Sequence, residues 1–493
     1  MSSANQSRVP MGTFVEFQVV ILTNDENHFA SELIDNKCKG LIKISNRCMI
    51  YYIIKNIIEQ RLKYITIVVN SKYLDDMVNY INETFPDNYK FDEKKNQNSY
   101  CIDVEPFTAN GNEEMGSIQC LLQIKNKIKS DFIVVNCDIL GFVDFHSLAN
   151  LFRGENAICA IMLLEDSPSN SDKKKKEIKE EYLNLENSVW VCIDKNSKVV
   201  SIKDSLSMKQ NGKLKISKIN LLFHRNFILK TDLLDSHVYI FKNYVLGIME
   251  HKKSFSSIKY DLIPYLVNIQ NTQRAAEYYS KSEFKFNMYK TLINKYEEGE
   301  DHTGEGKKEV DSCGAFDSEE NVESVVCYVQ PRVNGFCQRI NSVPNFIKAN
   351  LLVLIILQTN YFSSPFNHDL GSVPILPRCL GDPQESIRMH TGRVTHFYKD
   401  CIISSHFEHD ENIHLKKSVL GKNVTIRKNS TISRSICMDN ITINENCHIQ
   451  NTIICDNVVI EDNCKLIDCI IRENSVIEKN SCFEKETLPL FIS

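Results

Sequence analysis

The chain has 493 residues, of which 25% are charged and 42% hydrophobic, and its formal net charge is −5. This is the composition of an ordinary soluble globular protein with two or three domains. The negative charge is spread along the chain and argues against a nucleic-acid binder, which needs a basic face. The longest apolar run, Leu351–Leu357, is too short to cross a bilayer and predicts a buried helix segment.

The 18 cysteines are scattered and form no C-x-x-C pair, so we expect no structural zinc site. Isolated cysteines in a large chain fit a reducing compartment, where they pack as small hydrophobic residues. The polar N-terminus, MSSANQSRVP, has no signal-peptide core. We therefore expect a protein of the cytoplasm, in the cytosol, without a membrane partner.

From residue 15 onward, buried strand patterns alternate with helical ones. The helices are predicted from Met49 to Arg61 and from Leu74 to Thr84, and the strands are FVEFQVVIL, YITIVVN, CIDVEPF, DFIVVNCDI and AICAIMLL. Buried strands joined by helices predict an α/β fold with a doubly wound parallel sheet. Ligands bind such sheets at the carboxyl ends of the strands, here the loop Thr23–Lys43 and the segment Cys137–Asp138.

Two segments interrupt the α/β domain, which we place at residues 15–360 after an N-terminal tail, 1–14. Residues 272–323 are rich in charge and glycine and predict a disordered insertion, after which VVCYVQ resumes the domain. Residues 361–400 carry several prolines and predict an irregular linker.

Residues 401–485 repeat with a period of 17 residues. Short apolar triplets about six, six and five residues apart predict a three-walled parallel β-helix, in which each coil buries its side chains only by stacking on the next. Five columns keep the 17-residue step: Ile426, Ile443, Ile460 and Ile477; Val419, Ile436, Ile453 and Ile470; Ile432, Ile449, Leu466 and Phe483; Asn423, Asn440, Asn457 and Asn474; Asn429, Asn446, Asn463 and Asn480.

Asparagine suits the corners because it tolerates the left-handed backbone conformation. Small residues before one apolar column suit a crowded interior: Ser430, Cys447, Cys464 and Ser481. Five residues in the middle of triplets should point outward: Thr425, Thr431, Thr442, His448 and Lys465. The sequence leaves open which residues of the wall containing the Val419 column point inward.

The repeat resembles the hexapeptide-repeat left-handed β-helix, many members of which are acyltransferases with a catalytic histidine between protomers. His448 is the only histidine between residues 419 and 483. We interpret His448 as part of a solvated face and keep acyl transfer as an alternative.

An α/β domain followed by this β-helix resembles the sugar-nucleotide pyrophosphorylase family. That family has a G-x-G-x-R loop after its first strand, whose glycines let backbone N–H groups approach nucleotide phosphates. Here the loop reads LTNDENHFASELIDNKCKGLIKISN, without glycine before Gly40. By this resemblance, six residues occupy the positions of the family's nucleotide pocket: Asn24, Asp25, Glu26, His28, Lys39 and Asp138.

The chemistry of that family is expected to be lost. Two carboxylates in place of the glycines would repel a triphosphate, by about 4 kcal/mol for a pair of unit charges 4 Å apart at an effective dielectric constant of 20. Asp138 matches the family's metal-binding aspartate, but a single aspartate is weak support for a metal site. We therefore expect a vestigial pocket with no catalytic residue, no metal and no cofactor.

A resemblance over nearly the whole chain is to the gamma-subunit family of eukaryotic translation initiation factor 2B. It rests on MGTFVEFQVVI, VVNCDILGFVDFHSLANLFR, SFSSIKYDLIPYLVNIQ, VVCYVQPRVNGFCQRINSVPNFIKAN and NTIICDNVVIEDNCKLIDCII, in this order. A lysine-rich loop, Lys173–Glu181, lies where the family has a basic loop, although such a run is also typical of a solvated loop. The related epsilon subunits continue into a helical exchange domain, whereas this sequence ends at EKETLPLFIS, which favours gamma.

The resemblance implies a non-catalytic subunit of a guanine-nucleotide exchange factor. Its partners would be the epsilon subunit, other subunits of the complex and the GTPase substrate, initiation factor 2, without direct nucleic-acid contact. A sugar-nucleotide pyrophosphorylase or its regulatory paralogue is the main alternative, and it predicts Mg²⁺-dependent binding of a nucleoside triphosphate near Lys39 and Asp138.

Overall fold

The computed structural model describes residues 15–24, 29, 33, 37–86, 100–108, 115–165, 188–214, 216, 218–224, 226–270, 324–331, 337–358, 388–390, 397–399, 401–404 and 406–488. The tail 1–14, the insertion at 272–323, the basic loop Lys173–Glu181 and most of the segment 361–400 lie outside the described residues. No helix of the described residues is long and apolar enough to cross a membrane.

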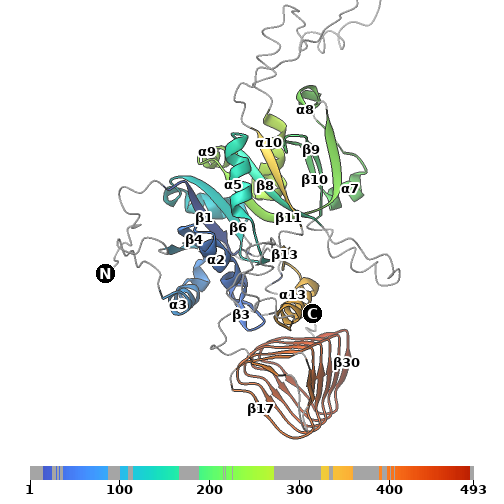
Figure 1. The fold of residues 1–493 in the computed structure, drawn as a ribbon. Helices are drawn as coiled ribbons and strands as arrows, with labels where there is room; N and C mark the ends of the chain where they lie inside the picture. Colours follow the sequence, from blue (N-terminus) through green and yellow to red (C-terminus); the bar gives the residue numbers. More distant parts are fainter. Residues whose placement is uncertain are drawn as a thin grey trace, which may run out of the picture.

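The α/β domain is built on one mixed sheet of nine strands (Figure 1). Four neighbouring strands are parallel: β6 (Asp131–Asn136), β1 (Phe17–Leu22), β4 (Tyr64–Asn70) and β5 (Cys101–Phe107). The other five are β8 (Cys159–Glu165), β9 (Ser188–Asp194), β10 (Val199–Asp204), β11 (Phe227–Phe241) and β12 (Val325–Gln330). The predicted α/β class is confirmed, although the sheet also contains antiparallel pairs among β6, β8, β9, β10 and β11. β12 pairs with β8 in parallel.

β11 makes most of the antiparallel pairs. It runs against β6, β8 and β9, with register shifts near Thr231 and Ser236 that let one long strand change neighbours. At the second shift, His237 adopts a left-handed φ of 55°. Bulges of this kind bend a strand and redirect its side chains.

Helices cover both faces of the sheet and create two cores. Alternate residues of β1 enter opposite cores, with Val19 and Ile21 on one face and Val20 and Leu22 on the other. The first core is covered by α2 (Met49–Glu59), α3 (Leu74–Thr84), α5 (Phe145–Gly154) and α13 (Val343–Gln358). The second is covered by α4 (Ser117–Gln123), α9 (Val245–His251) and α10 (Ile263–Ile269).

Shorter elements complete the domain. Three are short 3₁₀ helices, η1 (Lys39–Leu41), η2 (Ser71–Tyr73) and η3 (Lys125–Lys127), and one is a π-helix, η4 (Ile258–Leu262). Two are α-helices, α7 (Ser205–Asn211) and α8 (Lys218–Phe223). The strands are β2 (Lys43–Ile44), β3 (Arg47–Cys48), β7 (Ile139–Gly141) and β13 (Cys337–Arg339).

Most predicted elements agree with the structure, although several differ at their ends. The strand predicted over FVEFQVVIL begins at Phe17, and the one predicted over AICAIMLL begins at Cys159. The helix predicted to reach Arg61 ends at Glu59, since Arg61 takes a left-handed φ of 62°. The strand predicted over DFIVVNCDI ends at Asn136, because the chain turns at Cys137 and Asp138 before β7. The apolar run Leu351–Leu357 lies within α13, as expected of a helix segment.

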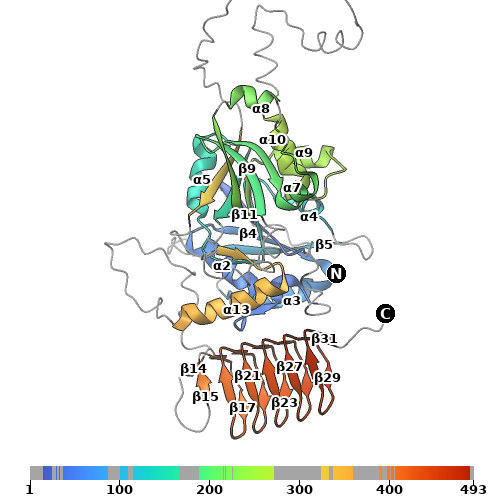
Figure 2. The ribbon, with the colours of Figure 1, turned by 90° about the vertical axis from the view of Figure 1, so that its right-hand side faces the viewer.

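The C-terminal region is a parallel β-helix with three walls, seen end-on in Figure 1 and from the side in Figure 2. The first wall contains β14 (Arg388–His390), β16 (Cys401–Ile403), β19 (Val419–Leu420), β22 (Ile436–Cys437), β25 (Ile453–Ile454), β28 (Ile470–Ile471) and β31 (Thr487–Leu488). The second contains β15 (Phe397–Lys399), β18 (His414–Lys416), β21 (Thr431–Ser433), β24 (His448–Gln450), β27 (Lys465–Ile467) and β30 (Cys482–Glu484). The third contains β17 (Glu408–His409), β20 (Thr425–Ile426), β23 (Thr442–Ile443), β26 (Val459–Ile460) and β29 (Val476–Ile477).

The β-helix begins before residue 401, the expected boundary. β14 pairs antiparallel with β16, and β15 pairs in parallel with β18. Part of the segment 361–400, expected to be a linker, therefore belongs to the first coil. β15 lies one 17-residue step before β18, whereas β14 runs against the direction of the coil and is not revealed by the repeat step.

The structure decides the orientation of the first wall. Leu420, Cys437 and Ile454 point into the β-helix, whereas their neighbours Val419, Ile436 and Ile453 join the core of the α/β domain. The Val419 column therefore follows the repeat but packs outside it. The other two apolar columns fill the interior as expected, with Phe483 partly buried at the end.

Asparagine ladders hold two of the three corners. All asparagines of both columns have a left-handed φ between 55° and 63°. Side-chain amides join successive coils, as in the bonds from Asn440 to Asn457 and from Asn457 to Asn474, both 3.0 Å. The third corner is also left-handed but lacks an asparagine column; its residues are Lys417, Arg434, Asn451, Asp468 and Lys485.

We expect Asn457→Ala to destabilise the β-helix more than Asn457→Gly. Both substitutions remove the ladder bonds, but only alanine resists the left-handed conformation, by about 1–2 kcal/mol. Thermal unfolding of the full chain, followed by circular dichroism, measures the difference. Asn444→Ala, in the same coil but outside the ladders, is the control and should change little. Equal effects of alanine and glycine at position 457 would contradict the conformational argument.

The described cysteines support the expected packing role. None of them forms a disulfide bond, and all except Cys337 and Cys482 are buried. Among the described residues, no group of three or more His, Cys, Asp or Glu side chains is placed to hold a metal ion.

Candidate functional site

A buried ion network lies at the carboxyl end of β6, where the sequence places the ligand site of the fold. Asp138 is fully buried, and its carboxylate lies between two cations. Lys39 Nζ, from η1, is 2.9 Å from Asp138 Oδ2. Arg339, at the end of β13, donates from Nη2 to Oδ2 at 2.7 Å and from Nε to Oδ1 at 3.1 Å. Both oxygens of the aspartate that matches the family's metal-binding residue are thus occupied by side chains of the protein.

The cations keep Asp138 ionised. Burial alone would raise the pKa of Asp138, but the charges and hydrogen bonds of Arg339 and Lys39 outweigh it and lower this pKa to about 2. Lys39 and Arg339 are only 4% and 6% exposed, so neither cation is solvated. The three groups therefore depend on one another for their charge compensation.

A second buried carboxylate, Asp235, extends the network from β11. Burial of Arg339 lowers its pKa, but the charge and hydrogen bonds of Asp138 raise it. The charges of Asp235 and Tyr239 raise it further, by smaller amounts. Asp235 Oδ2 accepts a hydrogen bond of 2.7 Å from the Tyr239 hydroxyl. The two buried cations thus have two buried carboxylates, Asp138 and Asp235, that compensate their charge.

His237 lies beside the network and is electrically neutral near pH 7. Burial lowers its pKa well below the ordinary value, and the charges of Arg339, Lys259 and Lys39 lower it further. Asn136 Nδ2 and His237 Nδ1 lie 3.3 Å apart. Both residues line a pocket of about 10 Å³ at the ends of β1 and β6. That volume holds about one water molecule.

Of the six residues expected in the vestigial pocket, the structure brings Lys39 and Asp138 into direct contact. Asn24 lies at the end of β1 and donates from Nδ2 to the carbonyl of Met115 at 3.3 Å. The other three, Asp25, Glu26 and His28, lie outside the described residues. Sequence reasoning missed Arg339, whose only signal was a charged residue in the otherwise uncharged segment VNGFCQRINSV.

The same loop attaches the α/β domain to the β-helix through two further lysines. Lys37 Nζ lies 3.0 Å from Asp456, and Lys43 pairs with Asp439. The two aspartates are 17 residues apart and lie in successive coils at one corner. Three lysines of this loop, Lys37, Lys39 and Lys43, thus bind carboxylates of the chain itself.

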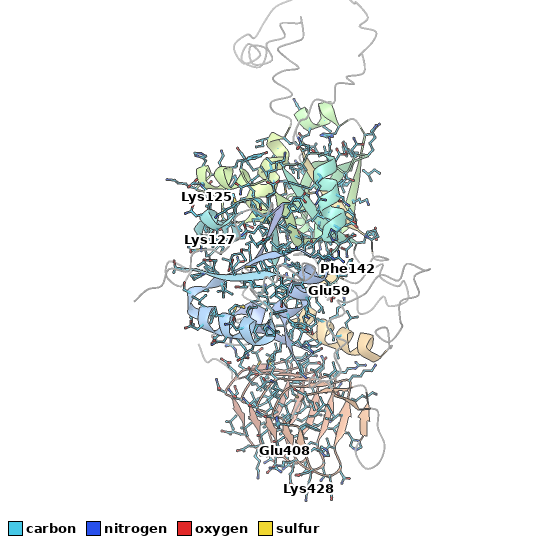
Figure 3. All side chains as sticks on the ribbon, turned by 60° about the vertical axis from the view of Figure 1, so that its left-hand side comes forward. Glu59, Lys125, Lys127, Phe142, Glu408 and Lys428 are labelled. Carbon is cyan, nitrogen blue, oxygen red and sulfur yellow. The ribbon has the colours of Figure 1, made fainter. Side chains whose placement is uncertain are left out.

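An apolar face completes this attachment, and we call it the docking wall. It comprises the outward residues of the first wall of the β-helix: Ile402, Val419, Ile436, Met438, Ile453, Cys455 and Ile470. Cys455 Sγ donates to the carbonyl of Leu33 at 3.0 Å. The labelled side chains of Glu408 and Lys428 lie on the opposite side of the β-helix, away from the α/β domain (Figure 3).

The tip of the β2–β3 hairpin contacts both α13 and the β-helix. Ser45 and Asn46 have φ values of 48° and 69°, as a tight hairpin turn requires. The Ser45 backbone N–H donates to Asn350 Oδ1 of α13 at 2.8 Å, and Asn46 Nδ2 donates to the Leu420 carbonyl at 2.9 Å. This turn therefore joins the α/β domain, α13 and the β-helix at one point.

The C-terminal region matches a known domain family. A family model described as the eIF2B subunit epsilon LbH domain, a left-handed β-helix, matches residues 385–484. The match begins just before β14, in agreement with the early start of the β-helix.

The similarity to one relative extends over both domains. A protein of Dictyostelium discoideum named translation initiation factor eIF2B subunit gamma is 24% identical over 444 residues, which cover 84% of this chain and 89% of the relative. This chain is a homologue of the eIF2B gamma subunits.

Two other eIF2B gamma subunits match over shorter stretches. The one from Schizosaccharomyces pombe is 29% identical over 162 residues, and the one from Caenorhabditis elegans is 24% identical over 166 residues. These alignments cover 33% and 37% of the two relatives and 32% of this chain in each case. The name gamma thus recurs in three organisms, although the β-helix model carries the name epsilon.

Proposed function

We propose that this chain is the non-catalytic gamma subunit of an eIF2B complex, the exchange factor that converts initiation factor 2 from its GDP-bound to its GTP-bound form. The observation that carries the proposal is the similarity to an eIF2B gamma subunit along 84% of the chain. In this role the protein assembles with an epsilon subunit in the cytosol and helps to hold the substrate GTPase. It needs no nucleic acid, metal or cofactor.

The geometry at Asp138 supports a non-catalytic role. A Mg²⁺ ion would have to displace Lys39 and Arg339 from the carboxylate, which would leave two cations buried without compensation. Breaking a buried pair in this way costs several kcal/mol. A triphosphate would also need the lysines that here bind Asp138, Asp439 and Asp456. The alternative of an active pyrophosphorylase is therefore disfavoured.

Affinity purification of the tagged full chain from its own cells tests the proposal. We expect an epsilon-like protein and initiation factor 2 to be recovered with it and identified by mass spectrometry. The matched control is the tag alone. Recovery of the chain without either partner would refute the proposal. Calorimetry supplies an independent refutation, since micromolar binding of GTP or UTP with release of pyrophosphate would restore the enzymatic alternative.

A further inference from the structure

The described residues between 188 and 232 lie, beside α9 and α10, at the end of the α/β domain opposite the β-helix (Figures 1 and 2). We call these residues the apical end. It contains β9, β10, α7, α8 and the first part of β11. Neither the Asp138 network nor the docking wall uses its residues, so its surface chemistry needs a separate explanation.

The apical end is strongly basic. Between residues 188 and 232 the sequence has three acidic residues, Asp194, Asp204 and Asp232, against eight lysines and one arginine. The basic residues are Lys195, Lys198, Lys203, Lys209, Lys213, Lys215, Lys218, Lys230 and Arg225, of which Lys215 and Arg225 lie outside the described residues. Asp204 caps α7 by accepting a hydrogen bond of 2.8 Å from the Ser207 N–H. Lys198 pairs with Glu155 at 3.2 Å. The surplus of positive charge stands out in a chain whose net charge is −5.

Exposed aliphatic side chains accompany this charge. Eight large hydrophobic side chains of the described residues are exposed, and four of them lie in the apical end. Ile228 is 68% exposed, and Leu206, Leu221 and Leu229 are 39%, 42% and 44% exposed. Apolar side chains gathered on a surface mark an interaction site more often than scattered ones do.

Among the described residues, no strand pairs with one side of β11 beside Ile228 and Leu229, and we call this side the free edge. Residues 227–230 of β11 pair with β9 on one side. On the other side, the first described pairing with β8 is at Leu233. An edge strand with exposed apolar side chains is a template for another strand unless it is covered.

We propose that the apical end binds an extended acidic segment of a partner protein, with aliphatic side chains among its carboxylates, which adds as a strand to the free edge of β11. The edge supplies backbone hydrogen bonds, the aliphatic side chains supply apolar contact, and the lysines complement the carboxylates. A single-stranded nucleic acid would contact only the lysines of this surface. Its bases stack on aromatic side chains, whereas the four exposed hydrophobic side chains are aliphatic. This inference does not depend on the proposed function.

Fluorescence anisotropy with the full chain tests the proposal, using a labelled peptide of alternating Glu and Val as the probe. We expect saturable binding that weakens with salt, because screening reduces the attraction of the lysines. A peptide of alternating Glu and Ser, with the same charge, should bind about tenfold more weakly for lack of apolar contact.

Two substitutions locate the site. The double variant Ile228→Thr/Leu229→Thr keeps residues that favour strands and should weaken binding of the Glu–Val peptide by about tenfold or more. Val476→Thr, at a residue that is 62% exposed on the β-helix, should leave binding unchanged. Circular dichroism confirms that each variant is folded.

Four results would overturn the proposal. They are no binding of the Glu–Val peptide, equal binding of the Glu–Ser peptide, binding unaffected by the double substitution, and tighter binding of a single-stranded RNA of similar charge. The last result would assign the apical end to nucleic acid.

Discussion

Asp138→Ala should destabilise the α/β domain by about 3–5 kcal/mol, the usual consequence of removing one partner from a buried ion pair. The substitution leaves Lys39 and Arg339 buried without the carboxylate that both contact. Denaturant unfolding followed by the fluorescence of Trp190 measures the effect. Trp190 is the only tryptophan and lies in β9, so its signal reports on the α/β domain.

A surface ion pair provides the matched control. Glu16 accepts from Arg153 Nη2 at 2.8 Å with both side chains about half exposed, and Glu16→Ala should change stability by about 1 kcal/mol or less. Similar unfolding midpoints for Asp138→Ala and the unmodified chain would show that the network does not stabilise the fold.

The pH dependence of stability provides a second measurement of the same network. The pKa of Asp138 is lowered from 3.8 to about 2 by folding, so the folded state binds its proton less readily than the unfolded state. The resulting stability, about 2 kcal/mol, is present above about pH 4 and is lost as the pH falls towards 2. The Asp138→Ala variant should lack this part of the acid transition.

Ile453→Asp should detach the β-helix from the α/β domain without unfolding it. Ile453 is 1% exposed within the docking wall and does not contribute to the interior of the β-helix. A buried carboxylate without a partner costs several kcal/mol, and separating the two domains lets water reach it. Hydrogen exchange should accelerate in residues 37–48, which cover the docking wall, and stay slow in the Asn-ladder coils. X-ray scattering should show a larger radius of gyration.

Val476→Asp is the control for this prediction. Val476 lies in the third wall of the same β-helix, is 62% exposed, and should tolerate the charge. Unchanged exchange in residues 37–48 of Ile453→Asp would show that the docking wall is not needed for attachment. Loss of protection throughout the β-helix would show that the two units fold as one.

The sequence predicted the helices and strands best where a local pattern defines them. YITIVVN and Leu74–Thr84 were predicted with the bounds that the structure gives β4 and α3. The 17-residue step predicted the walls and the two Asn corners, because each coil repeats the same local contacts. Lys39 and Asp138 lie in contact beyond the end of β6, but neither this contact nor the part of Arg339 in it was predicted.

Local sequence patterns did not predict the long-range contacts. Arg339 reaches Asp138 across 201 residues through the pairing of β13 with β7, which no local pattern signals. The antiparallel pairs of β11 depend on two register shifts in that strand, each set by competing neighbours.

The sequence by itself determined that a β-helix follows an α/β domain and that the loop after the first strand has no glycine before Gly40. Only the tertiary structure decided what the lysines of that loop contact. It placed the lysines of that loop against Asp138, Asp439 and Asp456, and it turned the Val419 column outward onto the α/β core. The physical reason is that a repeat fixes spacing along the chain. Which of two neighbouring apolar residues faces inward is settled by the surface available to bury the other.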